Sequence, residues 1–190
     1  NLVTDSWRDI KLVMQDRAIL RVTLGIVFFW SLASMAQMNI DVFVNEELAD
    51  NATKVSPGPF MGMLVIGVGI GSLLAGWWSN GRVELGMVPF GALMMGLACI
   101  LLYFTSDSPS MTGAMLMIIG LGGGLFNVPL IAYLQERSPH DKLGAILAAG
   151  QQLTAIGMLA VAVVFWLMQT PMHMSSPLIF LIAGIGILPI

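Results

Sequence analysis

The chain has 190 residues, of which 57% are hydrophobic and only 10% are charged, and its mean hydropathy is +0.86. Soluble domains carry about 25% charged residues, so this composition excludes an ordinary soluble domain and predicts an all-α, polytopic membrane protein. The net charge of −3 and the scattered basic residues exclude a nucleic-acid partner. The single cysteine, Cys99, excludes a disulfide within the chain.

Residues 1–16 are charged and amphipathic, and Trp7, Ile10 and Met14 share one helical face. They predict a cytoplasmic lead-in helix that lies along the membrane interface. Residues 17–190 predict a membrane domain, because long apolar runs follow one another. The last run is shorter than the roughly 20 residues that a span requires, so we expect this helix to be truncated. The expected spans lie near residues 17–44, 59–78, 85–105, 111–134, 144–168 and 177–190.

Basic residues gather in alternate connections between these spans. One side holds seven of them, whereas the connections on the opposite side hold only Lys54. Because positively charged connections stay in the cytoplasm, this bias predicts that the beginning of the chain is cytoplasmic. The seven residues are Arg8, Lys11, Arg17, Arg21, Arg82, Arg137 and Lys142.

Polar side chains inside a span are candidates for function, because they are costly to bury in lipid. In the first span, Trp30, Ser34, Gln37 and Asp41 fall on one face of a helix. This face predicts either the wall of a cavity that binds a polar headgroup, or a seam of hydrogen bonds to another helix. In the second case Asp41 simply marks the outer interface.

The fourth and fifth spans hold three further candidates. Asn127 lies deep in the fourth span, where its amide requires a partner on another helix or on a substrate. Gln151 and Gln152 lie in the first third of the fifth span. Adjacent helical residues diverge by about 100°, so at most one of these glutamines is expected to point squarely into a cavity.

Small residues and a proline predict the packing and flexibility of the fourth span. Gly122, Gly123 and Gly124, followed by Pro129, predict a hinge, because proline removes a backbone hydrogen bond and favours a kink. Glycines four residues apart also predict that two helices approach closely. These pairs are Gly67 with Gly71, and Gly120 with Gly124.

Most of the predicted membrane domain lacks ionisable residues. No Asp, Glu, Lys, Arg or His occurs in the long apolar tracts. Hydrolysis within the membrane requires a base or a metal, so we expect no enzyme activity and neither metal nor cofactor. A proton relay requires an embedded carboxylate, so either coupling residues lie elsewhere or transport is not proton-coupled. The tracts are residues 22–40, 55–81, 85–106, 108–135 and 143–172.

Two stretches, residues 69–93 and 124–153, carry a family resemblance. Residues 76–82 (GWWSNGR) resemble the loop motif G-x-x-x-D-R-x-G-R-R of the major facilitator superfamily, with Asn80 in place of the Asp and most of the arginines missing. A second run, V-P-L-x-A-x-x-Q-x-x-x-P, begins at Val128. With six expected spans, the chain resembles the C-terminal six-helix half of such a transporter. It looks closest to the lysophospholipid transporter branch and to the transporter part of transporter–acyltransferase fusions.

The resemblance implies one half of a carrier that works by alternating access in the bacterial inner membrane. The polar residues of the first, fourth and fifth spans would line a central cavity that binds a lysophospholipid headgroup, while the acyl chain stays near lipid. Asn80, Arg82, Gln135 and Arg137 would form the cytoplasmic gate. The implied partners are membrane lipids, the N-terminal six-helix half, and a fused or separate acyltransferase.

Two alternative functions remain open at this point. The first is export of a drug or metabolite, which would require a more polar or charged cavity. The second is that the chain forms the membrane part of an acyltransferase fusion. An acyltransferase carries an H-x-x-x-x-D motif, whereas here His140 is followed at once by Asp141.

Overall fold

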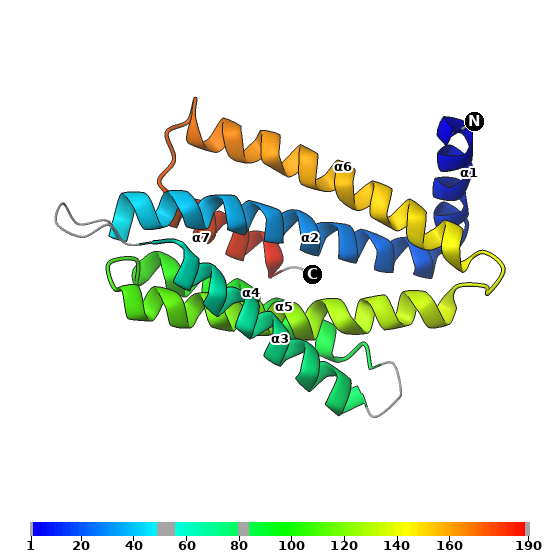
Figure 1. The fold of residues 1–190 in the computed structure, drawn as a ribbon, viewed down its shortest axis with the longest axis horizontal. Coiled ribbons are helices and arrows are strands. Elements are labelled where there is room, and N and C mark those ends of the chain that lie inside the picture. The colour runs from blue at the N-terminus through cyan, green and yellow to red at the C-terminus, as the bar shows by residue number, and fades with distance from the viewer. Residues whose placement is uncertain (1, 49–55, 80–83, 189–190) are drawn as a thin grey trace.

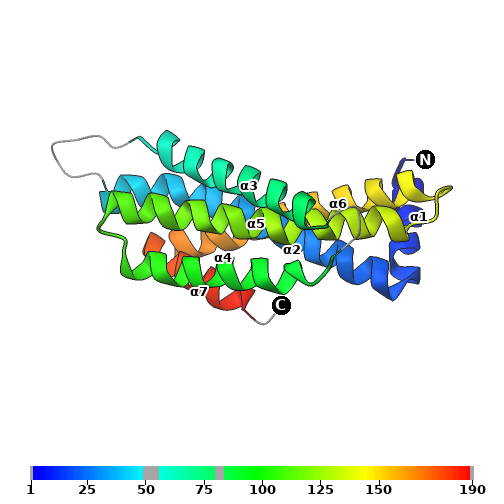
Figure 2. The same ribbon diagram turned by 90° about the horizontal axis from the view of Figure 1, so that it is seen from below.

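The computed structural model describes residues 2–48, 56–79 and 84–188 (Figure 1). Over these ranges all regular structure is helical, which confirms the all-α prediction. The first helix crosses one end of a bundle, and the other helices run along the long axis of the bundle (Figures 1 and 2). The elements are α1 (Leu2–Gln15), α2 (Arg17–Phe43), the π-helix η1 (Val44–Leu48), α3 (Gly58–Ser79), α4 (Met87–Phe104), α5 (Pro109–Arg137), α6 (Leu143–Gln169) and α7 (Ser176–Ile187).

Five of the described helices, α2 to α6, are long and apolar enough to cross a membrane. The last helix, α7, is also apolar but spans only 12 residues. Few of the long helices bury most of their surface, so much of their apolar surface remains exposed. An aqueous solvent does not tolerate such surface over most of a bundle, whereas lipid does.

Prolines and polar caps account for several helix ends. Both α5 and α7 carry a proline in the first turn, where the missing N–H costs no hydrogen bond. The helix α5 ends at Arg137, shortly before Pro139, which cannot continue it. At the opposite end of the bundle's long axis, a π-helix continues α2 beyond Phe43.

Asp16 makes the corner between α1 and α2. Its carboxylate accepts hydrogen bonds from the backbone N–H groups of Ala18, at 2.8 Å, and Ile19, at 3.4 Å. These bonds satisfy two donors that the first turn of α2 would otherwise leave free. The same carboxylate lies 3.4 Å from the guanidinium of Arg137, at the end of α5. One side chain thus caps α2 and ties the corner to α5.

The helices α3 and α5 pack with their backbones in direct contact. A Cβ atom built on Gly67 or Gly71 of α3 would collide with a carbonyl oxygen of α5. A Cβ atom built on Gly120 of α5 would collide in turn with the carbonyl oxygen of Leu64 on α3. This interface confirms the close approach that the paired glycines predict.

Three consecutive glycines let α5 touch three different helices. A Cβ on Gly122 would lie 2.8 Å from the carbonyl oxygen of Gly91 on α4, and one on Gly123 would lie 3.0 Å from the ring of Phe29 on α2. A Cβ on Gly124 would lie 2.6 Å from the carbonyl oxygen of Val68 on α3. The glycines therefore place α5 at the centre of the bundle.

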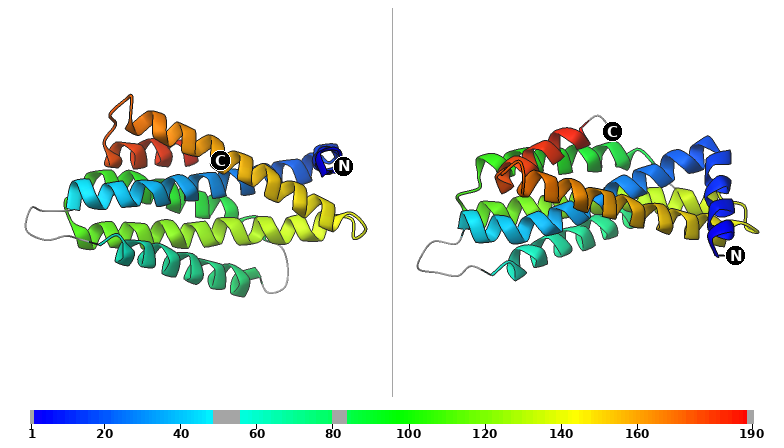
Figure 3. Two further views of the ribbon diagram at one scale, coloured as in Figure 1. Left: turned by 45° about the horizontal axis from the view of Figure 1, so that its top comes forward. Right: turned by 90° about the horizontal axis from the view of Figure 1, so that it is seen from above.

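The helix α6 lies at an edge of the bundle, opposite α3 (Figures 1 and 3). It packs mainly against α2 and α1, and only 6% of its most apolar segment is buried. The helix α7 packs against α4 and, to a lesser extent, α2. This arrangement leaves a space between α2 and the layer formed by α3, α4 and α5.

Candidate functional site

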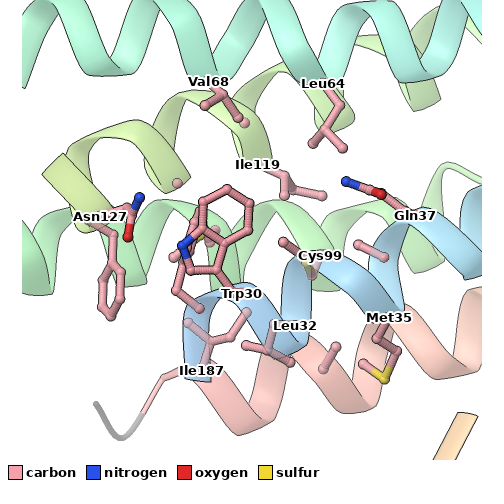
Figure 4. A pocket seen from close by; sticks show the side chains of 18 of the residues that line it. Trp30, Leu32, Met35, Gln37, Leu64, Val68, Cys99, Ile119, Asn127 and Ile187 are labelled. Carbon is pink, nitrogen blue, oxygen red and sulfur yellow. The ribbon is translucent and has the colours of Figure 1, made fainter. Parts of the chain in front are cut away.

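A cavity of about 340 Å³ occupies that space, between α2, α3, α4, α5 and α7 (Figure 4). Its volume is at the lower end of the range of about 300–1,000 Å³ that small-molecule sites occupy. Most of its wall is apolar, and none of the described residues that line it is Asp, Glu, Lys, Arg or His. On chemical grounds this cavity suits an apolar group accompanied by a few hydrogen bonds, rather than an ion.

Three of the predicted substrate-binding residues line the cavity, Trp30, Gln37 and Asn127, and so do Gly123 and Gly124 of the expected hinge. In Figure 4, Asn127 and Gln37 lie on opposite sides, and apolar side chains such as Ile119 and Cys99 lie between them. Trp30 comes from α2 and presents its indole ring to the space between them. The structure brings these three polar side chains to one cavity; a role in binding substrate stays a prediction.

The other candidates on α2 and α6 lie outside the cavity lining. Ser34 is half-buried on α2, and Asp41 is exposed near the end of this helix. Gln151 and Gln152 are both exposed on α6, which does not contribute to the wall. The helix α6 packs mainly against α1 and α2 and contributes no residue to the cavity lining.

Asn39 is a cavity residue that the sequence reasoning missed. It is fully buried, and its side-chain N–H donates to the backbone carbonyl of Ser176 on α7, at 2.9 Å. The hydroxyl of Ser176 donates in turn to the carboxylate of Glu46 in η1, at 3.1 Å. Asn39 lies nine residues from Trp30 and thus on the opposite side of α2, at about 100° per residue. A search along a single helical face could not find it.

Two amide oxygens at this cavity lack a hydrogen-bond partner. The side-chain oxygens of Asn39 and Asn127 are both buried, and neither accepts a hydrogen bond from any residue that the structure describes. A buried acceptor without a partner costs about 1–3 kcal/mol. Both atoms belong to residues that line the cavity, although the oxygens themselves are buried.

The expected gate residues are only partly placed. Asn80 and Arg82 lie outside the described residues. Gln135 is exposed near the end of α5, and Arg137 forms the ion pair with Asp16. The Ala18 amide, followed by the Ile19 amide and the guanidinium of Arg137, holds the pKa of the Asp16 carboxyl below its ordinary value of 3.8.

This corner borders a second cavity of about 350 Å³, which is distinct from the first. Arg137 and Lys142 contribute its positive charges and Asp16 contributes its negative charge. The charged end of the bundle and the apolar cavity therefore lie in separate places. Whether Gln135 and Arg137 act as a gate stays a prediction.

The expected hinge lies within one continuous helix. The helix α5 runs from Pro109 to Arg137 and includes Pro129, which is buried. Gly122, Gly123 and Gly124 are also buried, and each is in contact with a different helix. The structure thus gives these glycines a packing role, and bending at this position stays a prediction.

No group of three His, Cys, Asp or Glu side chains that could hold a metal ion occurs among the described residues. The thiol of Cys99 is buried in the cavity wall beside apolar neighbours. The chemistry available at this wall is therefore apolar contact and neutral hydrogen bonding.

Comparison with known proteins relates this arrangement to a family. The family model of the Major Facilitator Superfamily matches residues 2–162. The curated relatives include "Lysophospholipid transporter LplT" of Yersinia pestis (strain Pestoides F) and of Yersinia pseudotuberculosis (serotype O:3, strain YPIII), each 31% identical over 133 residues. The match covers 69% of this chain and 32% of each relative, so the chain spans about a third of their length.

No solved structure matches the chain significantly. The family match covers most of the chain, and the helices that it covers include all five candidate membrane spans in whole or in part. The resemblance to the superfamily is thereby confirmed. The chain belongs to the major facilitator superfamily, and its five candidate spans are those of a multi-pass membrane protein.

Proposed function

We propose that the transporter to which this chain belongs moves lysophospholipid across the bacterial inner membrane by alternating access. The observation that supports this most is the 31% identity to relatives named lysophospholipid transporters. An acyltransferase that restores the second acyl chain would consume the transported lipid in the cytoplasm.

The wall chemistry of the apolar cavity between α2, α3, α4, α5 and α7 also supports this proposal. A lysophospholipid joins a polar headgroup to one acyl chain, and the cavity joins polar amides to an apolar wall. A charged drug or metabolite without an apolar part would lose its hydration at this wall and gain neither a counter-ion nor apolar contact, whereas the acyl chain of a lysophospholipid suits this wall. The chain spans about a third of its relatives, so transport belongs to the whole protein.

Uptake of labelled lysophosphatidylethanolamine into vesicles that contain the full-length protein tests this proposal. We expect Asn127→Ala and Gln37→Ala each to lower the uptake rate about fivefold, because a net hydrogen bond contributes about 1 kcal/mol. Gln15→Ala is the matched control, since Gln15 is an exposed glutamine outside this cavity. Absence of uptake by folded wild-type protein would contradict the proposal.

A further inference from the structure

The apolar cavity between α2, α3, α4, α5 and α7 has an open side and a closed side. Val65 of α3 is 67% exposed and Trp30 of α2 is 38% exposed, and both line the cavity. Cys99 of α4 is only 5% exposed and Phe180 of α7 only 2%. The cavity therefore opens between α2 and α3, and α4 and α7 form its floor.

The polar side chains that line the cavity, buried Asn39 and Asn127 among them, belong to α2, α3 and α5, whereas α4 and α7 line the floor with apolar groups. Gln37 is exposed and Trp30 is partly exposed, so an amide and an indole N–H are available at the mouth. The hydroxyl of Ser72, also in the wall, already donates to the carbonyl of Val68 at 2.8 Å. The floor presents the side chains of Met95, Cys99, Ile179, Phe180 and Ile187.

The floor is unsuited to a phosphate or an ammonium group. None of the described residues that line the cavity carries a charge. A charged group moved to this floor would lose its hydration and gain no partner. A hydrocarbon chain loses nothing there, and the flexible Met95 side chain can adapt to its shape. The headgroup of a lipid is therefore expected at the mouth and its chain at the floor.

Along the axis of α2, which runs across the direction from mouth to floor, the cavity extends over about the thickness of one leaflet. Its lining on α2 extends from Phe28 to Asn39, which corresponds to about 16 Å along the helix axis. The hydrocarbon core of a bilayer is about 30 Å thick, so one leaflet contributes about 15 Å. This part of α2 is the half next to η1, which the charge bias predicts to be the non-cytoplasmic half.

We propose that the cavity within this chain holds the acyl chain of the lysophospholipid, with the chain end at the floor and the headgroup at the mouth. This proposal rests on the proposed function and assigns the apolar part of the substrate to this site. The chain would pass from the leaflet between α2 and α3 and end near Cys99. The earlier expectation, drawn from family resemblance, left the acyl chain in the surrounding lipid.

Photo-crosslinking locates the chain directly. The probe is lysophosphatidylethanolamine with a diazirine at the end of its acyl chain, added to vesicles that contain the full-length protein. We expect mass spectrometry to find adducts on floor residues such as Met95, Cys99 and Phe180. Adducts found only on lipid-facing residues such as Leu97 and Leu101, both exposed on α4, would overturn the proposal.

Filling the floor tests the same site by function. We expect Cys99→Phe to lower the uptake of octadecanoyl relative to decanoyl lysophosphatidylethanolamine by about tenfold, because a chain kept from burying about two methylenes binds roughly that much less tightly. Leu101→Phe is the matched control, since it adds bulk to the exposed side of the same helix. An unchanged ratio in folded Cys99→Phe protein would overturn the proposal.

The two tests separate the acyl-chain site from the proposed function. Adducts at the floor without uptake by the wild-type protein would support the site and contradict lysophospholipid transport. Normal uptake with no adducts at the floor would support transport and overturn the site. If Cys99→Phe fails to fold, the crosslinking of wild-type protein still decides whether the acyl chain reaches the floor of the cavity.

Discussion

The helices α5 and α6 have nearly the same length but opposite surroundings. In its most apolar segment α5 is 56% buried, whereas α6 is 6% buried. The helix α5 achieves this with glycines whose neighbours are backbone atoms of α3 and α4. The helix α6 instead exposes large apolar side chains such as Leu159, Val163 and Trp166. The comparison teaches that apolar composition shows that a helix belongs in the membrane, while glycines placed against the backbones of neighbouring helices let it pack deeply.

The largest loss of stability is expected from a larger side chain where α3 meets α5. We expect Gly67→Val to lower the free energy of unfolding by about 3 kcal/mol or more, because the side chain would collide with the backbone carbonyl of Met117. Thermal melting of the full-length protein in detergent measures the effect.

Gly69→Val is the matched control for this substitution. Gly69 lies two residues after Gly67 on the same helix, and a Cβ atom there meets nothing within 4 Å. Equal melting temperatures for Gly67→Val and Gly69→Val would show that α3 and α5 do not pack through their backbones.

The next effect in size concerns the buried contact between α2 and α7. We expect Asn39→Ala to lower the free energy of unfolding by about 2 kcal/mol, because the carbonyl of Ser176 would lose its buried donor. Asn45→Ala removes a similar 2.6 Å bond, to the carbonyl of Asp41, at an exposed position. An equal loss of unfolding free energy in Asn45→Ala and Asn39→Ala would show that burial does not strengthen the contribution of the Asn39 hydrogen bond. Both variants are measured by thermal melting.

A smaller effect is expected where α6 meets α2. A Cβ atom on Gly157 would lie 2.5 Å from the hydroxyl oxygen of Ser31 and 2.8 Å from a methyl group of Val27. Both neighbours are side chains that can move, so we expect Gly157→Ala to be about 1 kcal/mol less stable than Gly144→Ala. At Gly144 a Cβ atom meets nothing within 4 Å. A stability difference between Gly157→Ala and Gly144→Ala as large as that between Gly67→Val and Gly69→Val would show that α6 is packed as tightly as α5.

The smallest effect is a pH dependence at the end of the bundle where α1, α2 and α5 meet. The lowered pKa of Asp16 means that its ionised form stabilises the fold above pH 3.8, and that this contribution is lost as the pH falls through the lowered pKa. Asn also caps helices well, so Asp16→Asn removes mainly the charge. We expect wild type to melt slightly above Asp16→Asn at neutral pH and at the same temperature in strong acid. A difference in melting temperature between the two proteins that widened in acid would contradict a stabilising role of the ionised Asp16 carboxylate.

The membrane character of these helices and their close approach could be predicted from local sequence. Apolar runs and scarce charges predict an all-α membrane protein, because lipid requires every backbone group to be satisfied within the chain. The spacing of Gly67 with Gly71, and of Gly120 with Gly124, predicts close approach of helix backbones, and the structure shows that these two helices meet each other. The sequence pattern left open which helices the neighbouring Gly122 and Gly123 would meet.

The cavity was less predictable, because it depends on residues far apart in the chain. Asn39 contacts Ser176 across 137 positions, and nothing in the local sequence marks this pair. Gln151 and Gln152 looked equivalent to Gln37 as polar residues in an apolar run. The packing of α6 against α2 and α1 decides that these two glutamines lie outside the cavity.

The most direct measurement is the initial rate of lysophosphatidylethanolamine uptake into vesicles that contain the folded full-length protein, compared with vesicles that contain none. Lysophospholipid transport through the cavity of this chain predicts a rate well above the protein-free rate, and a rate reduced about fivefold in Asn127→Ala. Equal rates with and without the protein would contradict lysophospholipid transport.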